Sequence, residues 1–161
     1  MKNSIFKVND RLIGDEEPTY FIADIAANHD GNLEKAIELI NLSAESGADA
    51  AKFQNFKADT IVSDYGFKKL GTQISHQSSW KKSVTEVYSD ASISLDWTPI
   101  LKKECDKVGI DYFTSPYDIS FLNYLSDFVA AWKIGSGDIT WHEAIEKMSE
   151  FGLPLFLAAG A

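Results

Sequence analysis

Short apolar segments alternate with helical segments along most of this chain, and this rhythm restricts the fold more than any other feature. The apolar runs predict strands at residues 20–27, 50–53, 111–115, 129–134 and 153–158. Helical spacing predicts helices at residues 32–47, 95–108, 119–126 and 140–151. Near-continuous apolar strands separated by helices are typical of a parallel sheet covered by helices. We therefore predict an α/β fold with about five parallel strands and four helices.

The ends of two predicted helices carry recognisable signals. Asn32 is placed to be the N-cap of the first helix, and Gly47 lies just past its end. Gly109 ends the helix at residues 95–108.

A long polar segment interrupts the rhythm at residues 55–96, where a short helix is predicted at residues 81–88. Loops of this length in compact domains are usually functional or disordered, and loops that follow barrel strands surround the active site. This segment is a candidate lid.

Composition excludes several classes of protein. The chain has 161 residues, 45% of them hydrophobic, which suits one domain at residues 18–161 after a lead-in at residues 1–17. A net charge of −9 and a single arginine, Arg11, argue against nucleic acid as a partner. No apolar run approaches the roughly 20 residues of a membrane span. With Cys105 as its only cysteine and no signal sequence at its start, the protein is expected in the cytoplasm.

Two predicted strands end in a lysine, which is rarely buried without a partner. Lys52 and Gln54 end the second strand, and Lys133 ends the fourth, just before Gly135-Ser136-Gly137-Asp138. Alternation places Lys52 and Gln54 on one face of the sheet, opposite to Phe53. These strand ends predict an anion site.

The other strand ends are also polar. Asp24, Asn28 and His29 follow the first strand, and Thr114 and Ser115 end the third. Functional groups of parallel α/β folds gather at the carboxyl ends of the strands. The simpler alternatives are a structural ion pair of Lys133 with Asp24 or Asp138, a loop role for His29 and a turn role for Ser115 before Pro116.

Common catalytic and metal-binding motifs are missing from the sequence. His76 and His142 lack metal-ligand spacing with another histidine or cysteine, so no metal ligands are predicted. The sequence contains neither a P-loop, nor a full dinucleotide fingerprint, nor a nucleophile elbow.

Four ordered motifs resemble the sialic acid synthase family, whose members make N-acetylneuraminate and related nonulosonates such as legionaminate and pseudaminate. The resemblance covers roughly residues 18–161 and is carried by Ile22-Ala23-Asp24-Ile25-Ala26-Ala27-Asn28-His29-Asp30-Gly31, Gly47-Ala48-Asp49-Ala50-Ala51-Lys52-Phe53-Gln54, Phe113-Thr114-Ser115-Pro116 and Lys133-Ile134-Gly135-Ser136-Gly137-Asp138.

The resemblance implies a (β/α)₈ barrel that condenses phosphoenolpyruvate with the open-chain aldehyde of an N-acyl-aminosugar and releases phosphate. It implies a divalent cation, Mn²⁺ or Mg²⁺, whose ligands lie outside this chain. It also implies catalytic or sugar-contacting roles for Asp24 and Asp138, although both positions usually carry glutamate in the family. Substrate binding is implied for Lys52, Gln54, Ser115, Lys133, Ser136 and Asn28.

A complete barrel of this type takes about 250 residues, so this chain would supply the N-terminal part only. The family's Leu-Ser/Ala-Thr-Gly on the fifth strand is Leu157-Ala158-Ala159-Gly160 here, which removes one hydroxyl. With open sheet edges, the chain is expected to form a homo-oligomer or to belong to a longer polypeptide. Two alternatives remain: an inactive fragment that only binds the anion, and a Schiff-base aldolase that uses Lys133.

Overall fold

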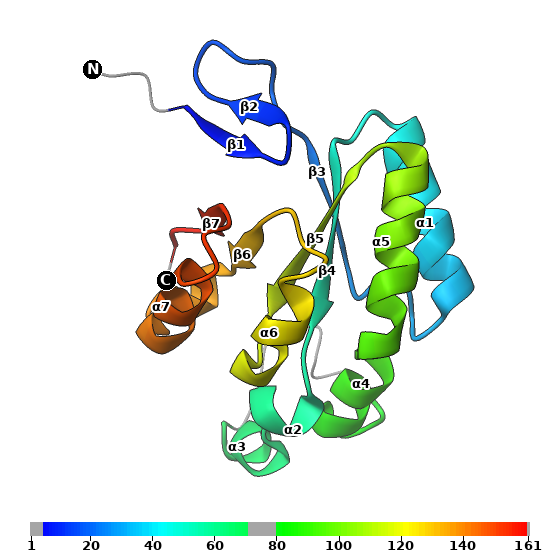
Figure 1. Cartoon of the computed structure of the whole chain (residues 1–161). Coiled ribbons are helices and arrows are strands. Elements are labelled where there is room, and N and C mark those ends of the chain that lie inside the picture. Colours follow the sequence, from blue (N-terminus) through cyan, green and yellow to red (C-terminus); the bar gives the residue numbers. More distant parts are fainter. Residues whose placement is uncertain (1–4, 71–79, 161) are drawn as a thin grey trace.

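A five-stranded parallel sheet with helices on one face forms the body of the protein (Figure 1). The computed structural model describes residues 5–70 and 80–160. The strands lie in the order β3 (Ile22–Ala26), β4 (Ala50–Asn55), β5 (Asp111–Pro116), β6 (Trp132–Ile134) and β7 (Leu155–Leu157). The main helices are α1 (Leu33–Glu45), α5 (Thr98–Val108), α6 (Leu122–Leu125) and α7 (His142–Ser149). The predicted partial α/β barrel is thereby confirmed.

The predicted helix ends are confirmed. The Asn32 side chain accepts a hydrogen bond from the backbone N–H of Lys35 at 2.9 Å and caps α1. Gly47 and Gly109 have φ angles of 83° and 79°, a left-handed conformation that glycine adopts without steric cost. The predicted strand at residues 129–134 is too long, since β6 begins only at Trp132. Residues 119–126 form a 3-10 turn at Ile119–Phe121 followed by the short α6.

The long segment after β4 contains more helix than its polar sequence predicts. It forms α2 (Ala58–Ile61), α3 (Asp64–Lys69), α4 (Val84–Ala91) and a 3-10 turn at Leu95–Trp97. Helix α4 begins later than predicted, because Ser83 and Glu86 cap it reciprocally. Residues 71–79, with His76 among them, lie outside the described residues, and the lid role stays a prediction.

Alternation along the strands divides the core into two clusters. The outer face of the sheet carries Phe53, Tyr112 and Trp132, which are fully buried beneath the helices. The inner face carries Ala50, Phe113 and Ala131, which form a second and smaller cluster. Helices therefore cover one face only, and another element has to cover the apolar part of the inner face.

A β-hairpin covers the N-terminal end of the inner face, in a region for which the sequence predicts no structure. Strands β1 (Phe6–Val8) and β2 (Arg11–Ile13) pair antiparallel. Val8 is fully buried in the inner cluster, and the Phe6 ring lies edge-on to Phe156 of β7 at 5.9 Å. Strands of three residues are too short to show a period, so the hairpin leaves little signal in the sequence.

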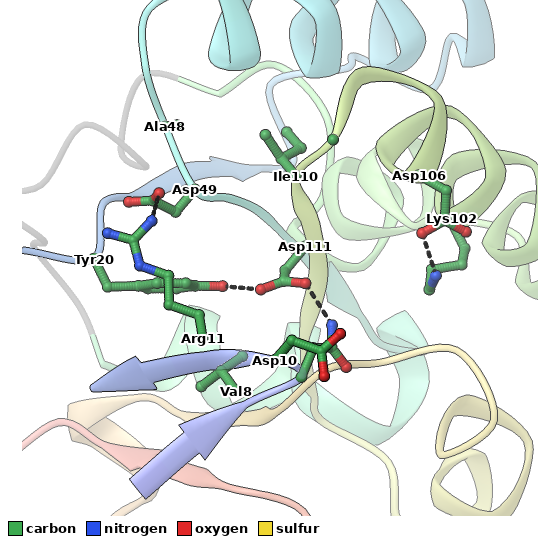
Figure 2. Close-up of a pocket in the computed structure, with 12 residues that line it drawn as sticks. Val8, Asp10, Arg11, Tyr20, Ala48, Asp49, Lys102, Asp106, Ile110 and Asp111 are labelled. Carbon is green, nitrogen blue, oxygen red and sulfur yellow. Dashed lines mark hydrogen bonds and ion pairs between the residues drawn. The ribbon is translucent and has the colours of Figure 1, made fainter. Parts of the chain in front are cut away.

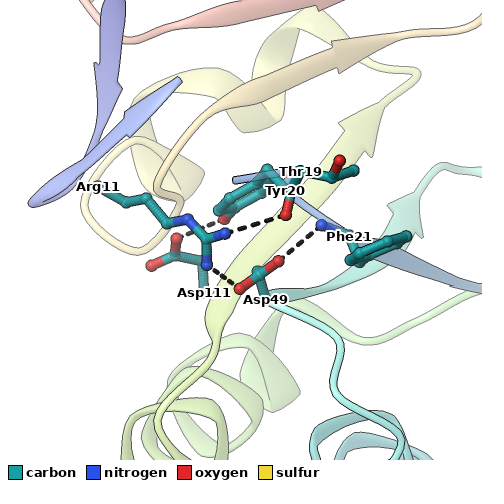
Figure 3. A network of polar contacts seen from close by, with 6 residues as sticks. All are labelled: Arg11, Thr19, Tyr20, Phe21, Asp49 and Asp111. Atoms are coloured by element: carbon teal, nitrogen blue, oxygen red, sulfur yellow. Dashed lines mark hydrogen bonds and ion pairs between the residues drawn. The ribbon is translucent and has the colours of Figure 1, made fainter. Parts of the chain in front are cut away.

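Polar contacts fix the hairpin to the starts of the parallel strands (Figure 3). Arg11 forms an ion pair with Asp49 and donates to the carbonyl oxygen of Thr19 at 3.0 Å. The other carboxylate oxygen of Asp49 accepts from the backbone N–H of Phe21 at 2.7 Å. Arg11 therefore joins the hairpin to the segments that lead into β3 and β4.

A cavity of about 700 Å³ lies beside this network, between the hairpin and the start of β5 (Figure 2). On its wall, Asp111 accepts hydrogen bonds from the Tyr20 hydroxyl and the Asn9 amide. Burial and the neighbouring Asp111 raise the pKa of Tyr20, so its phenol stays neutral. Nζ of Lys102 forms an ion pair with Oδ1 of Asp106 at 2.5 Å. The cations that line this cavity are therefore paired with carboxylates of the chain itself, as expected for a stabilising end of a barrel.

Replacing Arg11 with methionine is expected to lower the free energy of unfolding by about 1–2 kcal/mol, because a half-buried carboxylate loses its charged partner. Urea unfolding followed by circular dichroism measures the change. Lys82→Met is a matched control, since its ion pair with Asp90 is 61% exposed on both sides and should contribute nothing measurable. An equal effect in both variants would contradict a clamping role for Arg11.

Candidate functional site

The parallel register brings most of the predicted site residues onto one face of the sheet. Asp24 of β3 lies opposite Lys52 of β4, and Gln54 lies opposite Ser115 of β5. Lys133 is paired with Phe156 on the same inner face. We call Asp24, Lys52, Gln54, Ser115 and Lys133 the strand-end site. It lies at the carboxyl ends of the strands, at the opposite end from the hairpin.

Lys52 is the most buried charge of this site. Its side chain is 9% exposed, and Nζ forms an ion pair with Oδ1 of Asp24 at 2.7 Å. Asp24 itself is 64% exposed, so one partner is desolvated while the other stays in contact with water. A buried ammonium with one solvated partner retains donors for a second anion. The ion pair considered for Lys133 is thus made by Lys52 instead.

Lys133 is half-buried and donates to its neighbour's carbonyl oxygen, that of Ile134, at 2.5 Å. Burial lowers the pKa of Lys133 first, the positive charge of Lys52 lowers it further, and Asp24 opposes the shift. The two ammonium groups therefore repel each other across the inner face. A bound anion would relieve this repulsion, because its negative charge attracts both ammonium groups. Two such cations on one face therefore favour the binding of an anion.

Tyr117 is a site residue that the sequence analysis missed. It follows the strand-end pair Ser115-Pro116, and its hydroxyl accepts a hydrogen bond from Nε2 of Gln54 at 3.4 Å. Burial raises the pKa of Tyr117, and the charges of Asp138 and Asp24 add to the rise. In the sequence, only the position of Tyr117 directly after a strand end indicates a role in the site, and the preceding Pro116 indicates a turn instead.

The glycine-rich turn after β6 places Asp138 beside Tyr117. Residues Ser136–Asp138 form a 3-10 turn, in which the Asp138 N–H donates to the carbonyl oxygen of Gly135 at 3.1 Å. A Cβ atom on Gly135 would lie 3.1 Å from Oδ2 of Asp138 and 3.4 Å from the Tyr117 hydroxyl. Burial raises the pKa of Asp138. Ser136 is exposed on the same turn, with Gly160 close behind it.

Two residues predicted near the first strand lie differently. Asn28 is exposed and uses its amide to donate to the carbonyl oxygen of Ile25 at 2.9 Å, which stabilises the turn after β3. His29 is fully buried on the outer side, where its ring packs against Phe53 and Trp97. Burial lowers the pKa of His29. The residue still lies in the turn after β3, where its Nδ1 accepts a hydrogen bond from the Gly31 N–H at 3.1 Å, so the predicted loop role is confirmed and the ring is buried in addition.

No three His, Cys, Asp or Glu side chains gather into a possible metal site within residues 5–70 and 80–160. The described residues do not fit the divalent cation that the resemblance implies. No helix in the same ranges is long and apolar enough to cross a membrane.

Comparison with known proteins assigns a family to this arrangement. The model of the NeuB family matches residues 39–161, which include Lys52, Ser115, Lys133 and Asp138. This chain belongs to the NeuB family. The match begins inside α1 and runs through all later strands, so the strand-end site lies within it except for Asp24.

Relatives of this NeuB-family chain are named as synthases of sialic and related acids. It is 30% identical to human N-acetylneuraminate-9-phosphate synthase, with 93% of this chain and 41% of the relative covered. It is 31% identical to N,N'-diacetyllegionaminic acid synthase of Legionella pneumophila, with 91% and 41% covered. The chain therefore spans about two fifths of the length of these curated relatives.

Solved structures agree with the fold. The N-acetylneuraminic acid synthetase of Leptospira borgpetersenii, determined with citrate, superposes with a TM-score of 0.81 at 25% identity over 99% of this chain and 50% of that one. A truncated 3-deoxy-D-arabino-heptulosonate 7-phosphate synthase from Thermotoga maritima superposes at 0.62 with 14% identity, a likeness of fold alone.

Proposed function

We propose that this chain binds phosphoenolpyruvate at the strand-end site and forms the N-terminal part of a nonulosonate synthase. The full reaction would join phosphoenolpyruvate to the aldehyde of an N-acyl-aminosugar, with uptake of water and release of phosphate. The observation that carries the proposal is the convergence of Lys52 and Lys133 on the inner face, with only Asp24 in an ion pair to either of them among the described residues. Two cations sharing one carboxylate suit a ligand with both a phosphate and a carboxylate.

Each side chain has a role within this proposal. Lys52 and Lys133 neutralise the ligand's charge, while Ser115, Ser136 and Gln54 donate hydrogen bonds to its oxygens. A bound anion competes with Asp24 for Lys52, which frees the exposed Asp24 carboxylate for sugar hydroxyls. Asp138 would lie beside the reacting carbons, and burial raises the pKa of its carboxyl above the ordinary value.

Asn28, on the turn after β3, would reach substrate only if its local hydrogen bond to Ile25 were exchanged for one to the ligand. A divalent cation, Mn²⁺ or Mg²⁺, remains part of the proposal for the longer protein. Its ligands would lie outside the described residues. The protein would act in the cytoplasm, in keeping with its one free and buried cysteine, Cys105.

Calorimetric titration of the chain with phosphoenolpyruvate at several pH values tests the proposal. Because a bound anion favours charged Lys133, binding should take up a proton wherever this residue is partly neutral. Affinity should fall as the pH rises through the lowered pKa of Lys133. In Lys133→Met the affinity should be weaker, and this alkaline decrease should disappear.

Absence of phosphoenolpyruvate binding at any pH would refute the proposal. Binding without phosphate release, when an N-acyl-aminosugar and Mn²⁺ are added, would favour the alternative of an inactive anion-binding fragment. Phosphate release would support the synthase itself. The two readouts therefore separate a binding module from an enzyme.

A further inference from the structure

Tyr117 connects three elements that end at the same site. It follows β5, its hydroxyl contacts Gln54 at the end of β4, and it lies beside Gly135, where the turn after β6 begins. The hydroxyl oxygen of Tyr117 and Oδ2 of Asp138 both approach the position that a Cβ of Gly135 would occupy. A Cβ atom there would be tight against Oδ2 of Asp138, which would have to shift by a few tenths of an ångström, and in ordinary contact with the Tyr117 hydroxyl.

The Tyr117 hydroxyl has one proton to donate and an oxygen that can accept, and these two capacities determine its contacts. The phenol remains protonated at neutral pH, because burial and the charges of Asp138 and Asp24 all oppose its ionisation. Its oxygen accepts from the Gln54 amide, which turns the Gln54 carbonyl oxygen away from Tyr117. Its own proton is then available to Ser115, Asp138 or a bound anion. A phenylalanine would fill the same space and do neither.

We propose that Tyr117 is a positioning residue. Its hydroxyl orients the Gln54 carboxamide so that Gln54 and Asp138 face the same bound anion. The part of this inference that concerns affinity rests on the proposed function. The orientation of the Gln54 side chain by Tyr117 does not depend on any substrate. An exposed tyrosine at the same end, Tyr124, donates to Leu95 at 3.3 Å and touches none of these residues, which makes it a matched control.

Tyr117→Phe is expected to leave the urea midpoint unchanged but to shift the NMR resonances of the Gln54 side-chain NH₂ group. Phosphoenolpyruvate affinity should fall about threefold to tenfold, the usual effect of one lost hydrogen bond. Gln54→Met should weaken binding by at least as much. The double variant should bind like Gln54→Met alone, because Tyr117 acts through Gln54. Tyr124→Phe should change none of these measurements.

Unchanged Gln54 resonances in Tyr117→Phe would overturn the proposal, as would strictly additive losses in the double variant. If the wild-type chain binds no phosphoenolpyruvate, the proposed function fails, and the Gln54 resonances alone decide the role of Tyr117. If Tyr117→Phe does not fold, Tyr117 is a packing residue and the positioning role is refuted.

Discussion

Lys52→Met is expected to weaken phosphoenolpyruvate binding by at least about 100-fold, the largest effect of any single change in the strand-end site. The Lys52 side chain is only 9% exposed, so its charge acts through protein rather than through water, and little screening reduces its attraction for an anion. Methionine keeps the length and apolar stem of lysine but removes the charge. Isothermal titration calorimetry measures the loss directly.

Stability should change little in this variant, because the carboxylate left behind, Asp24, is exposed and can be hydrated. Lys57→Met is the control: Lys57 lies just after β4, the strand that carries Lys52, but it pairs with Asp118 at 2.9 Å, away from the inner face. The control variant should bind phosphoenolpyruvate normally. Equal affinity for Lys52→Met and the wild-type chain would remove Lys52 from the site.

Trp132→Ala should lower the free energy of unfolding by about 3–5 kcal/mol, because it empties the centre of the outer cluster. Trp132 is fully buried on β6, and its indole packs edge-on against Phe151 at 5.8 Å. The chain is expected to have only about 5–15 kcal/mol of stability in total, so this variant should be close to unfolding. The shift in the urea midpoint measures the loss.

Trp132→Phe gives a graded control for the same position. The indole Nε1 of Trp132 has no hydrogen-bond partner among the described residues, so phenylalanine loses volume but no hydrogen bond. We expect a loss below about 2 kcal/mol in this variant. A loss as large as that of Trp132→Ala would contradict a stability that is graded with the volume of the packed ring.

Local signals predicted the parallel sheet because each of them has a local cause. Apolar strands buried on both faces read as continuous hydrophobic runs, and Asn32, Gly47 and Gly109 mark helix ends through their own backbone chemistry. The hairpin has no such signature. Val8 is buried by residues on β4, β5 and the segment before β6, which are distant in the sequence. A single valine in the sequence does not predict such a contact.

The candidate site was also predicted only in part from the sequence. Strand alternation placed Lys52 and Gln54 on one face and Phe53 on the other, as the structure has them. The sequence could not choose the partner of each lysine, because that choice depends on register: Asp24 lies opposite Lys52 in the β3–β4 pair. Tyr117 was overlooked because its importance comes from Gln54 and Gly135, far away in the chain. The catalytic and binding roles of these residues stay predictions.

The hairpin and the strand-end site lie at opposite ends of the same strands, and this separation has a practical use. A fluorescent label on exposed Asp15, in the loop after β2, would report detachment of the hairpin without touching Lys52 or Lys133. Distant sites contribute additively to stability. The stability of this protein can therefore be changed through Arg11 and its affinity through Lys52, because these two residues lie at opposite ends of the sheet.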